Sequence, residues 1–563
     1  MRPSTLSATA LALGTLFASG IRAQGSCILA DTDFRKVVLD SVDVIQPQTL
    51  SPLPDGRLLY IERAGVVKML KPGVARPIIT AKFNVAVPYD DGLIGMVLDP
   101  NFTANGWVYL YLDPMSKDNV HRVSRFTLVG DTLSRPSEKV ILEVPENRNS
   151  CDHNGGTMSF DAQGNLYLST GDDTAPNTDS TKYAPLDERP GMACWDAQKS
   201  ASNTNDLRGK ILRIHPENTP VNGKNYTIPA GNLFPVGTAK TLPEIYVMGV
   251  RNPFRITVDP KTGWLLWGEV GPDADDPAPY GDPAGHDEFN VATAAGNFGW
   301  PYIIADNKPF SHVDFTNRQP GPFFKPEAPV NTSPNNTGLT NLPPAHPATI
   351  WYTYSGSSVF KGFDGGGHVA IGALFGGRTA IGGPLYRYNY DLKSTTKLPF
   401  NLDGKWLIGE WSQNWLKVVT LDSAGKLVSI EPFLSSWKWY KPMDIKVGQD
   451  GNLYIAEFGN NWSTNDKARI SRIEYTGTCQ ATSLMNPGKT AKRDGAPSLL
   501  SIAASGKGYL DVPANATRLE LLDLQGKRIW DTGLLPPGNR RVTLPKMGSG
   551  LVFVRISQGS VLR

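Results

Sequence analysis

Short stretches in which apolar and polar residues alternate recur along most of the chain, usually after an Asp-Gly or Asn-Gly turn. In each stretch, one alternating run leads through a polar turn to a second run that carries a basic residue. Alternation with a period of two residues, interrupted by such turns, is typical of antiparallel sheet. The stretches are "PDGRLLYIERAGVVKML" from Pro54, "ANGWVYLYLDP" from Ala104, "DAQGNLYLSTGDD" from Asp161, "EIYVMGVRNPFRITVDPKTGWLLWGEVG" from Glu244, "DGKWLIGEWSQNWLKVVTLDSAGKL" from Asp403 and "GQDGNLYIAEFGNNW" from Gly448.

The recurrence of a whole sheet predicts an all-β fold, a six-bladed β-propeller. About six units of roughly 70 residues lie between Asp33 and Tyr475, and each unit is longer than a four-stranded blade. We expect the surplus to form long loops at one mouth of the central channel, where a rigid scaffold can position functional groups. The propeller is predicted to occupy residues 24–480.

The pattern changes after Cys479. Residues 481–497 are rich in Gly, Pro, Ser and Lys and predict a linker. Residues 498–563 contain short alternating runs such as "LELLDLQGKRIW" and "GSGLVFVRIS", and predict a small C-terminal β-sandwich. This tail resembles the C-terminal sorting modules of bacterial surface and secreted proteins, which implies the secretion machinery as a partner. A generic β-sandwich accessory domain is the alternative interpretation.

The N-terminus, "MRPSTLSATALALGTLFASGIRAQGS", predicts a signal peptide over residues 1–23. Arg2 precedes an apolar run, and Ala23 suits a signal-peptidase site. A membrane anchor, the alternative, needs a longer apolar span of roughly 20 residues. No later segment is apolar enough to cross a bilayer. We therefore expect a bacterial protein that is secreted, extracellular or attached to the cell surface.

Composition excludes some partners and supports the fold. Charged residues make up 19% of the 563 residues and the formal net charge is +3, so no strongly basic balance favours nucleic acid or an anionic membrane. The 56 glycines and 45 prolines suit a turn-rich β protein better than a helical one.

Four cysteines remain after the predicted cleavage, and their spacing matches neither a zinc site nor a haem-attachment motif. An oxidising compartment favours two disulfides among three possible connectivities. We expect Cys27 to pair with Cys479 and Cys151 with Cys194. Free buried thiols are the alternative.

Six motifs in the propeller region resemble those of the PQQ-dependent soluble glucose/sorbosone dehydrogenase family, also called aldose sugar dehydrogenases. Each motif alone is weak, but all six occur in the order of the family. They are "DDGLIGMVLDPNF" from Asp90, "HNGGTMSFDAQGNLYLSTGDD" from His153, "RGKILRI" from Arg208, "VRNPFRITVDP" from Val250, "GEVGPD" from Gly268, and "DEFN" from Asp287 with "GNFGWPY" from Gly296.

The resemblance implies two cofactors. Pyrroloquinoline quinone (PQQ) is an ortho-quinone with three carboxylates, and it needs a divalent cation, cationic side chains and a flat slot. The backbone carbonyls of Gly271 and Pro272 match the family's Ca²⁺ ligands and are hard oxygen donors. Asp287 and Glu288 match a region that supplies structural Ca²⁺ ligands in some relatives, so Glu288 is a candidate for a second calcium site. Exposed acidic loop residues that are merely solvated are the alternative.

His153 matches the family's general base, and Asp172 matches the carboxylate that orients it. A neutral imidazole can take the proton of the sugar's anomeric hydroxyl while the hydrogen on the same carbon leaves as hydride. A paired carboxylate fixes the tautomer and stabilises the imidazolium. Without the resemblance, a histidine in a Gly-rich bend would be interpreted as an ordinary turn residue.

Arg251 and Asn252 match residues that contact the cofactor's quinone and carboxylate edge, a role that suits a guanidinium because it stays charged and makes paired hydrogen bonds. A structural Arg is the alternative. Asp90 lies where glucose-oxidising relatives carry a glutamine that contacts sugar and cofactor. A carboxylate departs from that pattern and leaves the sugar preference open.

The match is poorer for the remaining cofactor contacts. Arg378 is a candidate for binding a PQQ carboxylate, and the "EWSQNW" loop offers Trp411, Asn414 and Trp415. A Trp there can stack on the quinone plane or simply pack between blades.

The sequence thus predicts an exported PQQ- and Ca²⁺-dependent enzyme that oxidises an aldose at the anomeric carbon to a lactone. No CxxCH motif is present, so an external quinone or cytochrome must accept the electrons. A non-catalytic carbohydrate- or protein-binding propeller is the alternative. A Ca²⁺-dependent hydrolase such as a lactonase fits the motifs poorly.

Overall fold

The computed structural model describes residues 29–479 apart from 89, 118, 149–152, 176–183, 275–281, 354–358, 363–367, 371–377 and 462–464, together with strand segments between 498 and 558. The chain divides into two compact units, Met1–Ala481 and Thr482–Arg563. The predicted signal peptide and linker lie outside the described residues. None of the helices in the described part of the chain has the length and apolar character needed to span a bilayer.

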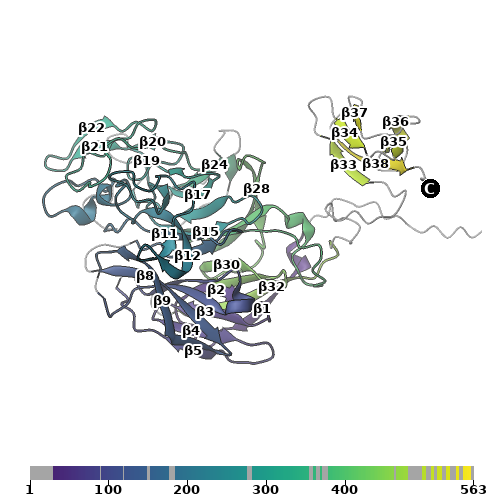
Figure 1. Cartoon of the computed structure of the whole chain (residues 1–563), viewed down its shortest axis with the longest axis horizontal. Helices are drawn as coiled ribbons and strands as arrows, with labels where there is room; N and C mark the ends of the chain where they lie inside the picture. Colours follow the sequence, from purple (N-terminus) through teal and green to yellow (C-terminus); the bar gives the residue numbers. More distant parts are fainter. Residues whose placement is uncertain are drawn as a thin grey trace, which may run out of the picture. The chain divides into compact units, whose positions relative to one another are not determined.

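Six of the sheets in the described part of the first unit are the blades of an all-β propeller, as predicted (Figure 1). The strands of the first two blades are β2 (Pro47–Pro52), β3 (Leu58–Glu62), β4 (Val66–Leu70) and β5 (Ile78–Lys82), then β6 (Leu93–Leu98), β7 (Trp107–Leu112), β8 (Val120–Val129) and β9 (Thr132–Pro145). The third blade contains β10 (Met158–Phe160), β11 (Leu166–Thr170), β12 (Lys210–Val221), β13 (Lys224–Thr227), β14 (Ile245–Met248) and β18 (Gly296–Asn297).

The other three blades complete the circle. The fourth contains β15 (Pro253–Val258), β16 (Leu265–Glu269), β17 (Asp287–Ala292), β23 (Ile350–Tyr352), β24 (Val359–Gly362) and β25 (His368–Ala370). The fifth contains β26 (Ala380–Leu385), β27 (Lys405–Glu410), β28 (Trp415–Leu421) and β29 (Leu427–Phe433), and the sixth β30 (Pro442–Val447), β31 (Leu453–Glu457), β32 (Arg469–Tyr475) and β1 (Phe34–Asp40).

The loops between these strands contain short hairpins and helical turns. Two hairpins stand outside the blades: β19 (Ile303–Ile304) with β20 (Lys308–Pro309), and β21 (Ser311–Asp314) with β22 (Gln319–Phe323). The helical turns are η1 (Asp31–Asp33), α1 (Phe102–Asn105), η2 (Ala193–Trp195), η3 (Ala197–Lys199) and η5 (Phe400–Leu402).

The first strands of the six blades form a closed ring. Strands β2, β6, β10, β15, β26 and β30 each contact the next, and β30 returns to β2. The second strands, such as β3, β11, β16 and β31, are buried along their whole length. Because each of these strands is covered on both faces by the adjoining blades, its sequence is apolar almost throughout, while the outer strands alternate.

The N-terminal strand closes the ring. Strand β1 pairs antiparallel with β32, with Phe34 opposite Tyr475, so the last blade takes its outermost strand from the start of the chain. The Phe34 ring packs edge-on against Phe433 and Tyr475, with ring centroids 5.4 and 5.2 Å apart. The buried Glu457 carboxylate binds Lys36 Nζ at 2.6 Å.

A buried carboxylate ends the second strand of four blades, and we call Glu62, Glu269, Glu410 and Glu457 the rim glutamates. Each accepts a hydrogen bond from a backbone N–H just before the first strand of its own blade. In three blades the donors are Ile45 (2.8 Å), Asn252 (2.9 Å) and Tyr440 (3.0 Å), and Thr379 donates to Glu410. The rim glutamates therefore fix the loops that enter the central ring.

The second unit consists of two antiparallel sheets. One has the strand order β33-β38-β35-β36 and the other pairs β34 with β37. The strands are β33 (Ser498–Ile502), β34 (Tyr509–Val512), β35 (Ala516–Leu522), β36 (Arg528–Asp531), β37 (Arg540–Thr543) and β38 (Gly550–Gln558). The sorting function of this unit stays a prediction.

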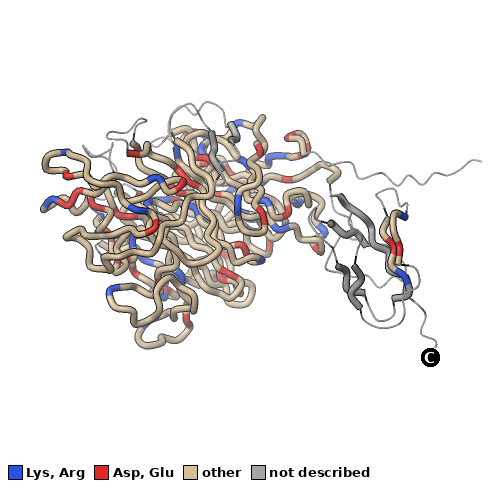
Figure 2. The backbone as a smooth tube through the Cα atoms, turned by 90° about the horizontal axis from the view of Figure 1, so that it is seen from above, with Lys and Arg blue, Asp and Glu red and all other residues tan. Residues whose placement is uncertain are grey.

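Charges of both signs are interspersed along the backbone of the first unit, without segregation into a basic or an acidic side in Figure 2. This distribution agrees with the low net charge of the sequence. The cysteines Cys194 and Cys479 are both disulfide-bonded. Their predicted partners, Cys151 and Cys27, lie outside the described residues, so the pairing stays a prediction.

Replacing Phe34 by alanine should destabilise the propeller because it removes the aromatic ring that packs against Phe433 and Tyr475, where β1 closes the circle of blades. We expect a loss of about 3 to 5 kcal/mol in the free energy of unfolding, measured by urea denaturation. Val38 on the same strand is 45% exposed, so Val38→Ala is the matched control, with an expected loss below about 1 kcal/mol. Equal effects of the two substitutions would contradict this account of ring closure.

Replacing Glu410 by glutamine should change how stability depends on pH. Burial raises the pKa of Glu410 from 4.5 to about 8, so between these values the folded protein holds a proton that the unfolded chain has lost. This contribution favours folding at low pH and is lost as the pH rises through about 8.

The free energy of unfolding of the wild type, relative to Glu410→Gln, should therefore fall by a few kcal/mol between pH 5 and pH 9, at about 1.4 kcal/mol per pKa unit. Urea denaturation at each pH measures this difference. Glu431→Gln, an exposed position on β29, is the control and should give a difference that does not vary with pH. A Glu410 difference that stays constant or rises with pH would contradict the buried, proton-binding carboxyl.

Candidate active site

The predicted site residues gather at one rim of the ring, where the chain enters the first strands and leaves the second strands. His153 precedes β10, Arg251 and Asn252 precede β15, and Arg378 precedes β26. Asp172 follows β11, and Gly271 and Pro272 follow β16. Antiparallel pairing brings the start of a first strand next to the end of a second strand, which explains why residues far apart in sequence meet here.

His153 and Asp172 form a buried pair. The Nδ1 atom of His153 lies 2.8 Å from Oδ1 of Asp172, and both side chains are buried. With Nδ1 held by the carboxylate, Nε2 is the ring atom that can take a proton. Burial alone would raise the pKa of Asp172, but the charge and hydrogen bond of His153 outweigh it and the pKa is lowered. The carboxylate is therefore ionised and able to stabilise an imidazolium.

Two further side chains hold the carboxylate of Asp172. Trp300 Nε1 donates to Oδ2 at 2.8 Å, and Thr174 Oγ1 donates to Oδ1 at 2.7 Å. Both oxygens are thus occupied, which fixes the carboxylate plane and, through it, the imidazole. Neither residue was predicted from the sequence, although Trp300 lies in the "GNFGWPY" motif.

The backbone around His153 is strained and close-packed. His153 has a φ of 73°, in the left-handed region that non-glycine residues rarely adopt. Opposite it, a Cβ added to Gly171 would lie 1.8 Å from the carbonyl oxygen of His153. Only glycine therefore fits at position 171, and this contact fixes how the histidine enters the site.

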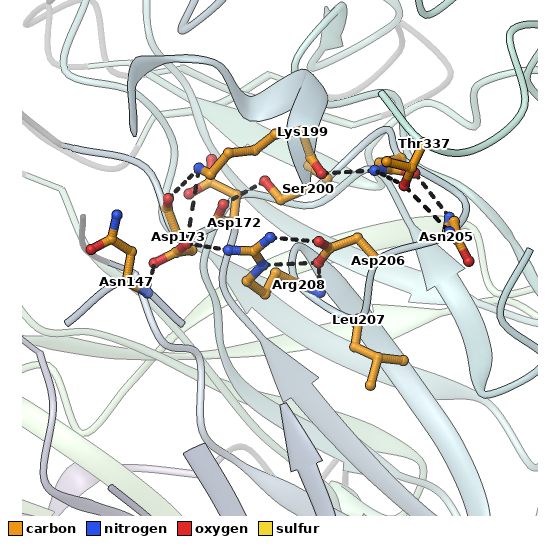
Figure 3. A network of polar contacts seen from close by, with 12 residues as sticks. Asn147, Asp172, Asp173, Lys199, Ser200, Asn205, Asp206, Leu207, Arg208 and Thr337 are labelled. Carbon is orange, nitrogen blue, oxygen red and sulfur yellow. Dashed lines mark hydrogen bonds and ion pairs between the residues drawn. The ribbon is translucent and has the colours of Figure 1, made fainter. Parts of the chain in front are cut away.

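A polar network anchors the strand end that carries Asp172 (Figure 3). The carbonyl of Asp172 accepts a hydrogen bond from Ser200 Oγ at 2.5 Å. The next residue, Asp173, binds Arg208 through its carboxylate and Lys199 through its carbonyl, at 2.5 Å for the latter. This network is partly buried, and it joins the strand end that carries Asp172 to the long insertion between β11 and β12.

Arg251 and Asn252 are linked directly to the pair. The backbone N–H of Asp172 donates to the carbonyl of Arg251 at 2.7 Å. Asn252 Oδ1 accepts the N–H of Gly155 at 3.0 Å. The Arg251 guanidinium donates to the carbonyl of Val270 at 3.0 Å. The structure thus brings together four of the predicted residues through direct or one-residue connections.

A small cavity adjoins this cluster. It is lined by Arg251, Gly271, Pro272, Glu288 and Trp300, with His286 and neighbouring apolar residues. Its water-accessible volume is about 10 Å³, room for about one water. A tricyclic quinone does not fit inside it.

The Gly271-Pro272 loop fits a cation-bridged anion. Arg378 Nη2 donates to the carbonyl of Pro272 at 2.6 Å, and Arg378 is buried. Because a carbonyl oxygen has two lone pairs, Pro272 can also bind a cation. A Cβ on Gly271 would lie 1.6 Å from the carbonyl oxygen of His286, so the tight loop requires glycine. Two buried guanidinium groups, Arg251 and Arg378, beside hard carbonyl oxygens suit a polycarboxylate held through Ca²⁺.

Glu288 lines the cavity, but its oxygens are used within the protein. Oε1 accepts the N–H of Ala305 at 2.7 Å, and Oε2 accepts Asn290 Nδ2 at 2.9 Å. Burial raises the pKa of Glu288 to about 7. The adjacent Asp287 accepts the N–H groups of Gly271 and Ala380. Both acidic residues are buried and hold loops, and a second calcium site stays a prediction.

Trp411 and Asn414 lie between β27 and β28, and their predicted contacts with the cofactor stay predictions. Trp411 is buried between blades against Phe458, at a centroid distance of 5.6 Å, and Lys441 Nζ lies 3.7 Å from its ring. Asn414 is an exposed turn residue whose Oδ1 accepts the N–H of Lys441 at 2.7 Å. Trp411 thus packs between blades, which was the alternative interpretation for this residue.

Asp90 is half-buried, and its neighbour Asp91 is the buried carboxylate at this point of the rim. Asp91 Oδ1 accepts a hydrogen bond from Asn154, the residue after His153. Asp91 therefore contacts the histidine loop, and the predicted contact of Asp90 with sugar and cofactor stays a prediction.

Comparison with known proteins identifies the family of the chain. The model of the glucose / sorbosone dehydrogenase family matches residues 44–340, a range that includes His153, Asp172, Arg251 and Gly271 but not Arg378. The quinoprotein glucose dehydrogenase B of Acinetobacter calcoaceticus is 24% identical over 298 residues, which cover 50% of this chain and 55% of that protein. Aldose sugar dehydrogenase YliI of Escherichia coli is 24% identical over 272 residues, covering 47% and 61%.

Among solved structures, the soluble aldose sugar dehydrogenase of Escherichia coli in its apo form superposes with a TM-score of 0.51 at 18% identity, covering 78% of this chain and 99% of that one. This likeness supports the propeller fold. The chain spans little more than half of the two curated relatives, at 55% and 61% of their lengths. With a family model matched over more than half of its residues, the chain belongs to the glucose/sorbosone dehydrogenase family.

Proposed function

We propose that the protein is a PQQ- and Ca²⁺-dependent dehydrogenase that oxidises an aldose at its anomeric carbon to a lactone. The observation that carries this proposal is the buried contact of 2.8 Å between His153 Nδ1 and Asp172 Oδ1, beside the Arg251 loop. Bound PQQ would supply the two-electron oxidant that accepts the anomeric hydrogen as hydride.

His153 takes the proton of the anomeric hydroxyl at Nε2. The developing imidazolium is stabilised by the ionised Asp172 at Nδ1, while Trp300 and Thr174 keep that carboxylate in place. General-base catalysis of this kind contributes about 10²- to 10⁴-fold in rate.

Arg251 and Arg378 would bind cofactor carboxylates, and the carbonyls of Gly271 and Pro272 would hold the bridging Ca²⁺. Both guanidinium groups are already oriented by backbone carbonyls, of Val270 and Pro272. Such preorganisation lowers the ordering entropy that binding costs.

Export, an external quinone or cytochrome as electron acceptor, and a role of residues 498–563 in secretion belong to the same proposal. They are supported by the N-terminal sequence, by the absence of a CxxCH motif and by the separate C-terminal unit.

Reconstitution tests the activity. Full-length protein treated with a chelator should oxidise at least one aldose from a sugar panel, with an artificial electron acceptor, only after both PQQ and Ca²⁺ are added. His153→Gln should bind PQQ normally and lose about 10²- to 10⁴-fold in kcat. PQQ binding without turnover of any sugar, aldehyde or alcohol would contradict the proposal and favour a binding propeller.

The role of Asp172 has its own test. Asp172→Asn should lower kcat by about 10³- to 10⁴-fold, because an amide neither fixes the productive tautomer nor stabilises the imidazolium. The change should also alter the pH profile of kcat/KM. Asp161→Asn is the matched control: Asp161 is a buried carboxylate of the same blade that accepts turn N–H groups at the opposite end of β11. An unchanged pH profile in Asp172→Asn would exclude this role.

A further inference from the structure

A second cluster of ionisable side chains lies in the neighbouring blade, and we call Asp91, Asp113, His121 and Glu146 the blade-two cluster. Asp91 precedes β6, Asp113 follows β7, His121 lies at the start of β8 and Glu146 follows β9. Antiparallel pairing brings these four positions to the same end of the sheet. Their ligand atoms lie within 4.8 Å of one another, the spread expected for atoms on opposite sides of an ion with bonds of roughly 2.1 to 2.4 Å.

The polar atoms of this cluster are buried without enough partners. Asp91 Oδ2 and Asp113 Oδ2 have no hydrogen-bond partner among the described residues, and both side chains are more than nine-tenths buried. Glu146 Oε2 contacts His121 Nε2 but makes no hydrogen bond of normal geometry in the described part of the chain. Buried polar atoms are nearly always paired, so oxygens left facing one another indicate a ligand between them.

The other blades show that this arrangement is a departure from the repeat. Asp113 lies one residue past the position of the rim glutamates, which accept backbone N–H groups at the ends of β3, β16, β27 and β31. In blade two the carboxylate is one bond shorter and follows the strand. One oxygen of Asp113 binds Arg148 and the other faces the cluster. Asp113 therefore does not hold the loop before β6 as the rim glutamates hold their loops.

The charge of the cluster calls for a divalent cation. Three carboxylates carry −3 and Arg148, which contacts Asp113 and Glu146, carries +1, so the sum with a neutral imidazole is −2. Burying this charge uncompensated is very unfavourable.

We propose that the blade-two cluster is a metal site that binds one divalent cation through carboxylate oxygens of Asp91, Asp113 and Glu146 and through Nε2 of His121. One imidazole with three carboxylates suits Mn²⁺ or a similar first-row ion better than Ca²⁺, which takes oxygen ligands. The ion is distinct from the one proposed at Gly271 and Pro272.

The site is connected to the catalytic loops on both sides. Asp91 accepts a hydrogen bond from Asn154, next to His153. Between Glu146 and Arg148, the N–H of Asn147 donates to Asp173 at 2.9 Å, next to Asp172 (Figure 3). The ion would therefore fix both loops that position the His153–Asp172 pair, without contacting the substrate.

Mn²⁺ binding to the full-length, chelator-treated protein without PQQ tests the proposal. The wild type should bind one Mn²⁺ ion per chain. Electron spin-echo envelope modulation of the bound Mn²⁺ should show coupling to an imidazole nitrogen. An ion held only by the carbonyls of Gly271 and Pro272 would lack this imidazole signal, so the two sites are distinguishable in the wild type itself. Mn²⁺ bound without imidazole coupling, or no stoichiometric binding, overturns the proposal.

Substitution provides the second measurement. His121→Gln should abolish the nitrogen signal, and both it and Asp113→Asn should weaken Mn²⁺ binding about tenfold or more. Glu143→Gln is the matched control, since Glu143 lies on β9 and pairs with Arg122 outside the cluster; it should leave affinity and signal unchanged. Mn²⁺ should raise the unfolding temperature of the wild type and of the control but not of His121→Gln. An equal rise in all three contradicts the site.

Discussion

The loops of the active rim depend on buried carboxylates that accept backbone N–H groups. A buried charge or polar group is unfavourable unless it is hydrogen-bonded, so each rim glutamate stabilises the fold only when the loop before the first strand offers its N–H in the right place. Glu269 shows the consequence: it accepts the N–H of both Arg251 and Asn252 and the indole N–H of Trp267. The positions of two proposed cofactor-binding residues are thus set by a residue that touches no ligand.

Blades two and three use the same position differently. They lack the glutamate at the strand end and instead carry Asp113, one residue past β7, and Asp172, two residues past β11, and each of these lies by a buried histidine. The shorter side chain does not cap the entering loop, and the carboxylate turns to an imidazole instead. In blade three this gives the proposed general base. In blade two it gives a cluster whose charge and unpaired oxygens are unlike those of any rim glutamate. The two sites are therefore variants of one structural repeat.

Local pattern was sufficient for the blades because each second strand is covered on both faces and is apolar, as in "LLYIE" and "LYIAE". It was not sufficient for ring closure: β1 pairs with β32 across almost the whole length of the propeller, and nothing near Phe34 in sequence signals Tyr475. The His153–Asp172 pair followed from family motifs, since spacing alone cannot show that two residues on either side of a hairpin meet.

Sequence alone does not show which residues of a loop are buried. Asp90 and Asp91 differ by one position, yet Asp91 is buried and binds Asn154 while Asp90 is half-buried. Trp411 directly follows a rim glutamate and packs between blades, where it contacts Phe458 and Lys441. Trp300 and Thr174 were missed because their role is defined by the carboxylate they hold. A repeated Glu at the ends of "YIE", "WGE", "IGE" and "IAE" was a signal available in the sequence.

The electrostatic balance of the rim favours an anionic ligand. Burial raises the pKa values of Glu269 and Glu410 to about 8 and that of Glu288 to about 7, so near neutral pH these carboxyls carry much less negative charge than ordinary glutamates. Arg251 and Arg378 are buried at the same rim. Each guanidinium donates to a backbone carbonyl, and Arg378 Nη1 also lies 3.7 Å from the carboxylate of Asp287. The burial that makes the glutamates good loop caps therefore also reduces the negative charge around these two guanidinium groups, which favours binding of an anionic cofactor.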